Sequence, residues 1–351
     1  MSLKDLQVEA GAVFNEENGS LPPIHYGDSA FEYQAVKTGV GLVDRSGRGK
    51  LRITGKDRTR FLHGMVTNTV QGLSEWAGNH AALTTVHGQT LLDLWVHHLG
   101  EYLWLETEFG YQARLYDTLD RYLIADDVVM TDETQNWVIL GVVGPLAGSN
   151  IKKVVGLVGD DLSEHHTVMG QWNELPIWVT RCSFLGEDGF DVRVSVGVGA
   201  DLWRALVGAG AIPVGTLAQE VLRIEAGIPL CGIEIDEAVA PLEVGLEDTV
   251  DFNKGCYIGQ EVIAKMHFRG KPRRYLVGVR LDREKLIAPN TEVVVDDKVV
   301  GRVTSCVHSM ALNGVIALAV IKRGMHEVGQ RVLVGEAEGE IVSLPFVEVK
   351  K

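Results

Sequence analysis

The stretch from Asn253 to Glu261 gathers more reactive side-chain types than a plain turn requires. It reads NKGCYIGQE and places a thiol and a phenol, Cys256 and Tyr257, between two glycines that lie four residues apart. Glycine is used where the backbone takes a positive φ or is approached closely, so Gly255 and Gly259 predict a shaped loop or a strand end.

Cys256 is the residue of this stretch with the widest range of possible chemistry. A thiolate acts as a nucleophile, a redox partner or a cluster ligand, and the nearby ammonium of Lys254 would favour the thiolate. Iron–sulfur clusters usually need four thiolates, so a cluster bound by Cys256 would also need ligands from a partner protein or a second subunit. The alternative is a buried structural cysteine. An amide and a carboxylate, Gln260 and Glu261, complete the stretch.

Composition excludes several classes of function. The chain has 351 residues, 46% of them apolar and 23% charged, which is ordinary for a globular protein of about two or three domains. Neither a membrane-spanning run nor an N-terminal signal pattern is present, which predicts a cytoplasmic protein without a membrane partner. The net charge of −14 argues against nucleic-acid binding.

The cysteines do not indicate a metal site. Four are present, far apart in the sequence and without a CxxC pair, so neither a zinc knuckle nor a disulfide scaffold is expected. Apart from Cys256, we expect the remaining three in the core: Cys182, Cys231 and Cys306.

The periodicity of the chain predicts strands mixed with helices, followed by a β-rich end. Residues 81–85 and 91–99 have strand character and are expected to pair across the turn His87–Gln89. From Tyr275 onward, short β-rich runs alternate with closely spaced turns, as in a small antiparallel barrel or sandwich. We therefore place a domain boundary near Arg273.

Several segments, in order along nearly the whole chain, resemble the folate-binding aminomethyltransferase superfamily. Its members include the glycine-cleavage T-protein, folate-dependent demethylases and the YgfZ-type proteins linked to iron–sulfur cluster metabolism. The matching segments include TGKD (54–57), RCSFLGEDGFD (181–191), LRIEAGIPL (222–230), PLE (241–243) and GRVTS (301–305). KGCYIGQE (254–261) is similar to the YgfZ-group signature KGCYxGQE, whereas the T-protein usually has no cysteine there.

The resemblance implies a three-lobed α+β fold, GcvT-like, around a central folate channel. Residues 1–48 together with 136–272 would form a discontinuous folate-binding lobe. Residues 49–135 would form a second α+β lobe, and residues 273–351 a C-terminal antiparallel β-barrel.

The resemblance also implies binding residues for tetrahydrofolate. Glu187 matches the family glutamate that accepts hydrogen bonds from the pterin edge, although by composition alone it is an exposed turn residue. Phe184 stands where the family has tyrosine; it keeps the stacking surface and loses the phenol hydrogen bond. Arg223 and Tyr257 are further candidates for binding the cofactor.

Asp93 is the candidate catalytic carboxylate, together with Cys256 as the candidate thiol. The T-protein has two adjacent aspartates after a glycine turn, whereas this chain has Leu92 and Asp93. If Asp93 faces the folate, it could orient the reactive nitrogen or accept a proton; otherwise it is a solvated residue on a strand. The absence of one of the two aspartates argues against efficient aminomethyl transfer.

Two functional hypotheses follow from the resemblance. The leading one is a YgfZ-type tetrahydrofolate-binding protein that supports assembly or repair of iron–sulfur enzymes, with those enzymes or assembly proteins as partners. The alternative is a tetrahydrofolate-dependent aminomethyl- or methyltransferase that takes its one-carbon unit from a lipoyl carrier protein or a small amine. The basic run Lys265–Arg274 would meet an acidic partner or a folate polyglutamate tail, or serve as a solvated linker; a pure interaction module explains none of the folate-like motifs.

Overall fold

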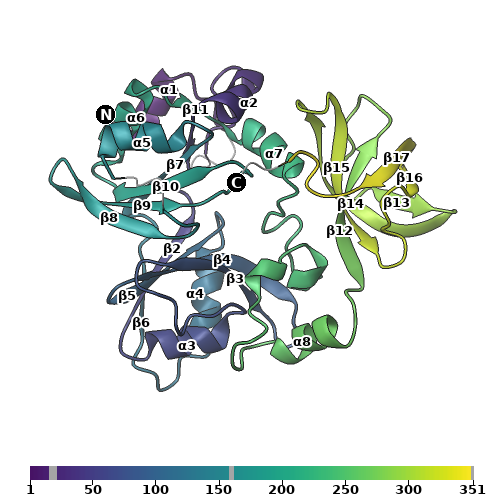
Figure 1. Cartoon of the computed structure of the whole chain (residues 1–351), viewed down its shortest axis with the longest axis horizontal. Coiled ribbons are helices and arrows are strands. Elements are labelled where there is room, and N and C mark those ends of the chain that lie inside the picture. Colours follow the sequence, from purple (N-terminus) through teal and green to yellow (C-terminus); the bar gives the residue numbers. More distant parts are fainter. Residues whose placement is uncertain (16–21, 158–161, 349–351) are drawn as a thin grey trace.

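The computed structural model describes residues 1–15, 22–157 and 162–348, which form three lobes (Figure 1). Two lobes are sheets covered by helices, and the third is a closed barrel. The predicted α+β class with a C-terminal antiparallel barrel is confirmed. No helix in these ranges has the length and apolar composition that a membrane crossing requires.

The first lobe is a six-stranded sheet in the order β11-β1-β7-β10-β9-β8. Its strands are β1 (Gly41–Asp44), β7 (Trp137–Val143), β8 (Thr167–Trp172), β9 (Leu175–Arg181), β10 (Gly189–Ser195) and β11 (Ile212–Pro213). Its helices are α1 (Leu3–Glu9), α2 (Ser29–Thr38), α5 (Ala147–Val155), α6 (Gly199–Gly208) and α7 (Thr216–Glu225). Helices α1, α5 and α6 bury their apolar sides against one face of this sheet.

The second lobe is a five-stranded sheet in the order β3-β4-β5-β2-β6. Its strands are β2 (Gly49–Thr54), β3 (Gly78–Thr84), β4 (Thr90–Leu99), β5 (Tyr102–Thr107) and β6 (Val129–Asp132), covered by α3 (Arg58–Met65) and α4 (Gln112–Asp120). Strands β3 and β4 form the expected antiparallel pair. Because side chains alternate along a strand, Leu92, Leu94 and Val96 of β4 enter the core, and the residues between them face the first lobe.

The C-terminal lobe is a closed barrel in the order β12-β15-β14-β13-β16-β17. Its strands are β12 (Arg274–Leu281), β13 (Glu292–Val295), β14 (Lys298–Ser309), β15 (Gly314–Lys322), β16 (Arg331–Val334) and β17 (Ala337–Val342). Helix α7 packs between this barrel and the first lobe (Figure 1).

The segment that follows α7 differs from the predicted division of the chain. That division assigns it to the first lobe, but its apolar side chains complete the core of the second: Cys231, Ile235, Val239, Val244 and Leu246. The segment contains two short 3₁₀ helices, η2 (Pro241–Glu243) and η3 (Glu247–Thr249), and then leads into α8 (Gln260–Phe268). Sequence spacing could not show this, because the segment crosses between lobes to find its apolar partners.

A buried ion pair joins the two sheets. Arg193 of β10 and Glu106 of β5 form two hydrogen bonds, one of 2.9 Å between Nη2 and Oε2, and their side chains are 3% and 1% exposed. Trp104 donates its indole N–H to the same carboxylate over 2.8 Å. Burial alone would raise the pKa of Glu106, but the charge and hydrogen bonds of Arg193 lower it overall.

We expect Arg193→Leu to lower the free energy of unfolding by about 3–5 kcal/mol, because it strands the Glu106 carboxylate between the sheets without its partner. Urea denaturation measures the loss. The control is Arg331→Leu, which removes an exposed pair with Asp282 and Glu338 and should cost much less. Equal losses in the two variants would contradict a structural role for the buried pair.

His97 of β4 lies in the same interface and predicts a pH dependence of stability. Its side chain is buried, and neither ring nitrogen has a hydrogen-bond partner among the described residues. Burial, reinforced by the charge of Arg193, lowers the pKa of His97 to about 3. Below the ordinary histidine pKa the unfolded chain binds this proton and the folded chain does not, so stability falls as the pH drops from about 6.5 toward 3.

Replacing His97 with leucine removes this proton linkage. Between pH 7 and about 4.5, we expect His97→Leu to lose about 2 kcal/mol less stability than the parent protein. Chemical denaturation at both pH values measures the difference. Identical pH dependence in the two proteins would show that His97 binds its proton as readily in the folded chain as in the unfolded chain.

Candidate functional site

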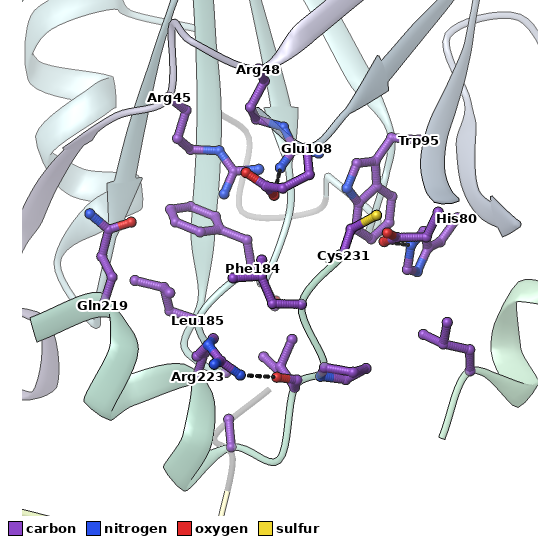
Figure 2. Close-up of a pocket in the computed structure, with 18 of the residues that line it drawn as sticks. Arg45, Arg48, His80, Trp95, Glu108, Phe184, Leu185, Gln219, Arg223 and Cys231 are labelled. Atoms are coloured by element: carbon purple, nitrogen blue, oxygen red, sulfur yellow. Dashed lines mark hydrogen bonds and ion pairs between the residues drawn. The ribbon is translucent and has the colours of Figure 1, made fainter. Parts of the chain in front are cut away.

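A cavity of 1120 Å³ opens between the two sheet lobes and is closed on a third side by α7 and the segment after it. Aromatic rings and charged side chains lie next to each other on its walls (Figure 2). The aromatic residues are Trp95, Phe109 and Phe184, and the charged ones include Arg45, Arg48, Asp93, Glu108 and Arg181. Such a mixture suits a ligand that has both flat apolar and charged parts.

Asp93 lies on the cavity wall, as its candidate role requires. It belongs to β4, and its side chain is 19% exposed. Its Oδ2 lies 2.8 Å from Nε2 of His80 on β3. Burial alone would raise the pKa of Asp93, but the hydrogen bond and attraction of His80, together with Arg48, lower it below the usual range. The group is therefore a carboxylate at neutral pH.

The alternation of β4 also explains the Leu92 departure. Leu92 is fully buried in the core of the second lobe, on the face opposite Asp93. Two adjacent residues of a strand point to opposite faces, so the first residue of an aspartate pair at this place would not line the cavity. Leu92 therefore belongs to the core, and the cavity face keeps a carboxylate at Asp93.

Cys231 has a larger part in the cavity than its predicted core position suggests. It is 6% exposed and packs with the core of the second lobe, yet it also lines the cavity. Figure 2 shows its sulfur directed toward the side of the cavity that holds His80. Burial, with a contribution from Asp93, raises the pKa of the Cys231 thiol to about 12, so the group stays protonated.

Phe184 forms the opposite wall together with Arg45. The Arg45 guanidinium lies 3.7 Å from the centroid of the Phe184 ring, a cation–π contact, and its Nε lies 3.0 Å from Oδ1 of Asp191. Gly141 of β7 makes room for both, because a Cβ there would lie 2.7 Å from the phenylalanine ring and 2.8 Å from Arg45. Arg48 lies beside them and pairs with Glu108 over 2.8 Å.

Arg223 lines the cavity but has no donor left for a ligand. A guanidinium has five N–H groups. Those of Arg223 are taken by Glu220, Glu234, Ser305 and the carbonyl of Ile228 in five hydrogen bonds. The predicted cofactor-binding role does not fit this arrangement. Arg223 instead connects α7, the segment after it and the barrel.

Glu187 is not among the residues that line the cavity. It lies in the turn between β9 and β10 and is 5% exposed, so the exposed-turn alternative is wrong. Its carboxylate is bonded to Lys37 of α2. Its predicted contact with a pterin stays a prediction that this position does not favour.

The KGCYIGQE stretch also lies outside the cavity wall. Cys256 is exposed, and Tyr257 is 8% exposed and packs against Leu242, Val250 and Ile263. Gly259 has a φ of +85° and precedes α8; a Cβ there would lie 2.6 Å from the carbonyl oxygen of Thr85. The basic run Lys265–Arg274 likewise lines no part of the cavity.

Lys254 anchors this stretch to the second lobe. Its ammonium donates to the carbonyl oxygens of His63, Val66 and Asn68 over 2.6, 2.7 and 2.7 Å. Burial lowers the pKa of Lys254 to about 8. Because Asn68 lines the cavity, the lysine supports the cavity wall from behind. Its charge is directed to these carbonyls, so its predicted activation of the Cys256 thiol has no support in the contacts.

We expect Lys254→Met to lower the free energy of unfolding by roughly 2–4 kcal/mol, because three carbonyls lose a charged donor. Cys256→Ala, two residues away on the surface, should change stability little. Urea denaturation of both variants provides the measurement. A Lys254→Met protein as stable as its parent would refute the anchoring role.

The most informative residues that the sequence did not single out are His80, Trp95, Arg45 and Arg48. Trp95 lies in the expected strand 91–99, but the expected partner strand, 81–85, begins one residue after His80; the observed register places His80 opposite Trp95. Arg45 lies in a family-like segment, VDRS (43–46), to which the resemblance assigned no binding role, and Arg48 carried no such signal. The described ranges contain no group of three or more histidine, cysteine or acidic side chains placed to bind a metal ion.

Comparison with known proteins gives consistent matches along the chain. Residues 3–254 match the GCVT N-terminal domain, and residues 274–348 match the glycine cleavage T-protein C-terminal barrel domain. An aminomethyltransferase of Rubrobacter xylanophilus is 32% identical over 339 residues, covering 94% of this chain and 89% of that protein. Another, from Picosynechococcus sp., is 31% identical over 357 residues, covering 99% and 98%.

A solved structure shows the same fold. It is the glycine cleavage system aminomethyltransferase T from Bartonella henselae, with a TM-score of 0.91 and 24% sequence identity. The match covers all of this chain and 98% of that one, so all three lobes have counterparts there.

Proposed function

The chain belongs to the glycine-cleavage T-protein (GcvT) family, and from this premise we propose that it is a tetrahydrofolate-dependent aminomethyltransferase. The observation that carries the proposal is the Asp93 carboxylate, held ionised on the wall of a large cavity between the lobes. The donor would be an aminomethyl group on a lipoyl carrier protein.

The cavity fits tetrahydrofolate, the cofactor of this family. A folate has a flat pterin, a benzoyl linker and an acidic tail, and the walls offer aromatic faces at Phe184 and Trp95. The Nε atom of Arg48 is buried without a hydrogen-bond partner among the described residues, whereas that of Arg45 lies 3.0 Å from Oδ1 of Asp191. A buried donor such as that of Arg48 needs an acceptor, which a polar edge of a folate would provide. These four residues would hold the cofactor.

Asp93 would work as an anion rather than as a strong base. When bound, tetrahydrofolate supplies the nitrogen atoms that accept the one-carbon unit. A carboxylate fixed in a partly dry site stabilises positive charge that develops on a neighbouring nitrogen and orients that nitrogen. The partial burial of the Asp93 side chain strengthens this interaction relative to bulk water.

The YgfZ-type iron–sulfur function has less support. It rests on the resemblance of KGCYIGQE, whereas the curated relatives reported above are named aminomethyltransferases. Cys256, the thiol of that hypothesis, is exposed and does not line the cavity. An exposed thiol is accessible to a partner protein, so this remains a second, weaker proposal.

We expect Asp93→Asn to bind tetrahydrofolate within about threefold of the parent and to lower kcat for aminomethyl transfer at least about 100-fold, as loss of a stabilising group in a preorganised site does. Fluorescence titration measures binding, and ammonia release from an aminomethylated lipoyl carrier protein measures transfer.

The matched control for this prediction is Asp282→Asn, a change of an exposed carboxylate on the barrel. It should leave both quantities unchanged. A parent-like kcat in Asp93→Asn would remove Asp93 from the proposed mechanism, and loss of binding alone would make it a binding residue.

A further inference from the structure

We propose that His80 is a second catalytic residue, which Asp93 holds in one tautomer so that its other ring nitrogen can take up the proton released during transfer. The inference rests on the proposed transferase function and deepens it. A carboxylate that stays ionised well into the acid range is a weak base, so the reaction needs another group to accept its proton. Imidazole exchanges protons near neutral pH and is the usual choice.

The β-sheet register brings the two side chains together. His80 on β3 lies opposite Trp95 on β4, and Ala82 lies opposite Asp93. His80 and Asp93 are therefore diagonal neighbours on one face of the sheet, within reach of each other across the strand pair. The small side chain of Ala82 leaves the carboxylate free to turn toward His80, and Nε2 and Oδ2 lie 2.8 Å apart.

The imidazole ring of His80 stacks on the Trp95 indole, with ring centroids 4.0 Å apart and an interplanar angle of 19°. The backbone of His80 is fixed separately, because its carbonyl accepts a hydrogen bond of 2.8 Å from the side-chain amide of Asn68. In this arrangement Nε2 meets Asp93, and Nδ1 has no hydrogen-bond partner among the described residues.

The titratable groups near the His80–Asp93 pair include Arg48, Glu108 and His165. Asp93 is its direct partner, and Arg48, the next charged neighbour of Asp93, is itself paired with Glu108. His165 lies on the Trp95 ring, 4.7 Å between centroids. Burial lowers the pKa of His165 to about 4, so it is neutral at pH 7 and does not repel an imidazolium.

The arrangement follows the logic of carboxylate–histidine pairs in other enzymes. The carboxylate accepts the Nε2 proton, fixes the tautomer and stabilises the imidazolium, and the second nitrogen acts as the base. Both residues line the cavity, so Nδ1 can meet a reacting nitrogen there.

The bonds and protons of the transfer balance without a further reagent. As the carbon moves from carrier to acceptor, two C–N bonds form, and its C–S bond and its original C–N bond break. The two acceptor nitrogens lose one proton each, and these end on the departing ammonia and on the carrier thiol. His80 would take one of them at Nδ1 and return it to the leaving group.

The pairing can be tested without any ligand by NMR of the histidine ring nitrogens in the full chain. The His80 signals are assigned by their absence in His80→Gln. Because the Asp93 carboxylate accepts the Nε2 proton, Asp93→Asn should shift the His80 ring-nitrogen signals away from the Nε2–H tautomer toward a mixture of tautomers. Ring-nitrogen signals that do not move would overturn the pairing.

The catalytic role has a separate readout in kinetics. We expect His80→Gln to lower kcat at least about 100-fold, to change the KM for tetrahydrofolate less than about threefold, and to abolish the acidic limb of the kcat–pH profile. The control is His308→Gln, an exposed histidine of the barrel strand β14, which should retain the parent profile. A His80→Gln enzyme with a parent-like kcat and pH profile would refute the role.

The two readouts separate this inference from the function on which it rests. If the parent protein transfers no aminomethyl group, the proposed function and the catalytic role of His80 both fail, and the NMR measurement still decides the pairing. If transfer occurs and His80→Gln fails to fold, the tautomer change in Asp93→Asn and the acidic limb of the parent profile decide the proposal. Absence of that limb then counts against it.

Discussion

The buried Arg193–Glu106 pair is the interaction on which the rest of the site depends, because it fixes how the two sheets face each other. It does not act alone. Trp104 of β5 packs edge-on against Trp137 and Trp178 of the first lobe, with ring centroids 5.7 and 5.6 Å apart. Large aromatic rings and a desolvated, fully hydrogen-bonded ion pair resist sliding, since any shift would expose the rings or break the pair.

The cavity is the unfilled end of the same interface. Each sheet turns one face to its own helices and the other to its neighbour sheet. At one end tryptophans close the gap. At the other, smaller or polar residues stand on the facing strands, and Gly141 and Ala82 leave room for larger groups beside them. Asp93 and Phe184 thus line the same cavity from different lobes. Ligand binding in the cavity therefore depends on a rigid interface between the two sheet lobes.

Local sequence patterns predicted the β3–β4 hairpin and the short strands of the C-terminal lobe, because alternation and turn residues are local signals. The three-lobed α+β fold was implied by the family resemblance of motifs along the chain. Motifs placed Asp93 and Phe184 at the site, and both line the cavity. Motifs could not show which acceptors the side-chain donors bind in the folded chain. Arg223 is saturated by protein acceptors and Glu187 is bonded to Lys37, through contacts distant in sequence. His80 was missed because its importance depends on strand register rather than on a motif.

The most direct test of the account is whether the protein releases ammonia from an aminomethylated lipoyl carrier protein in a tetrahydrofolate-dependent manner. The account predicts release that requires tetrahydrofolate and that matches the methylenetetrahydrofolate formed, mole for mole. Tight tetrahydrofolate binding without any ammonia release from the carrier would contradict the transferase assignment and would favour a binding function for the same cavity.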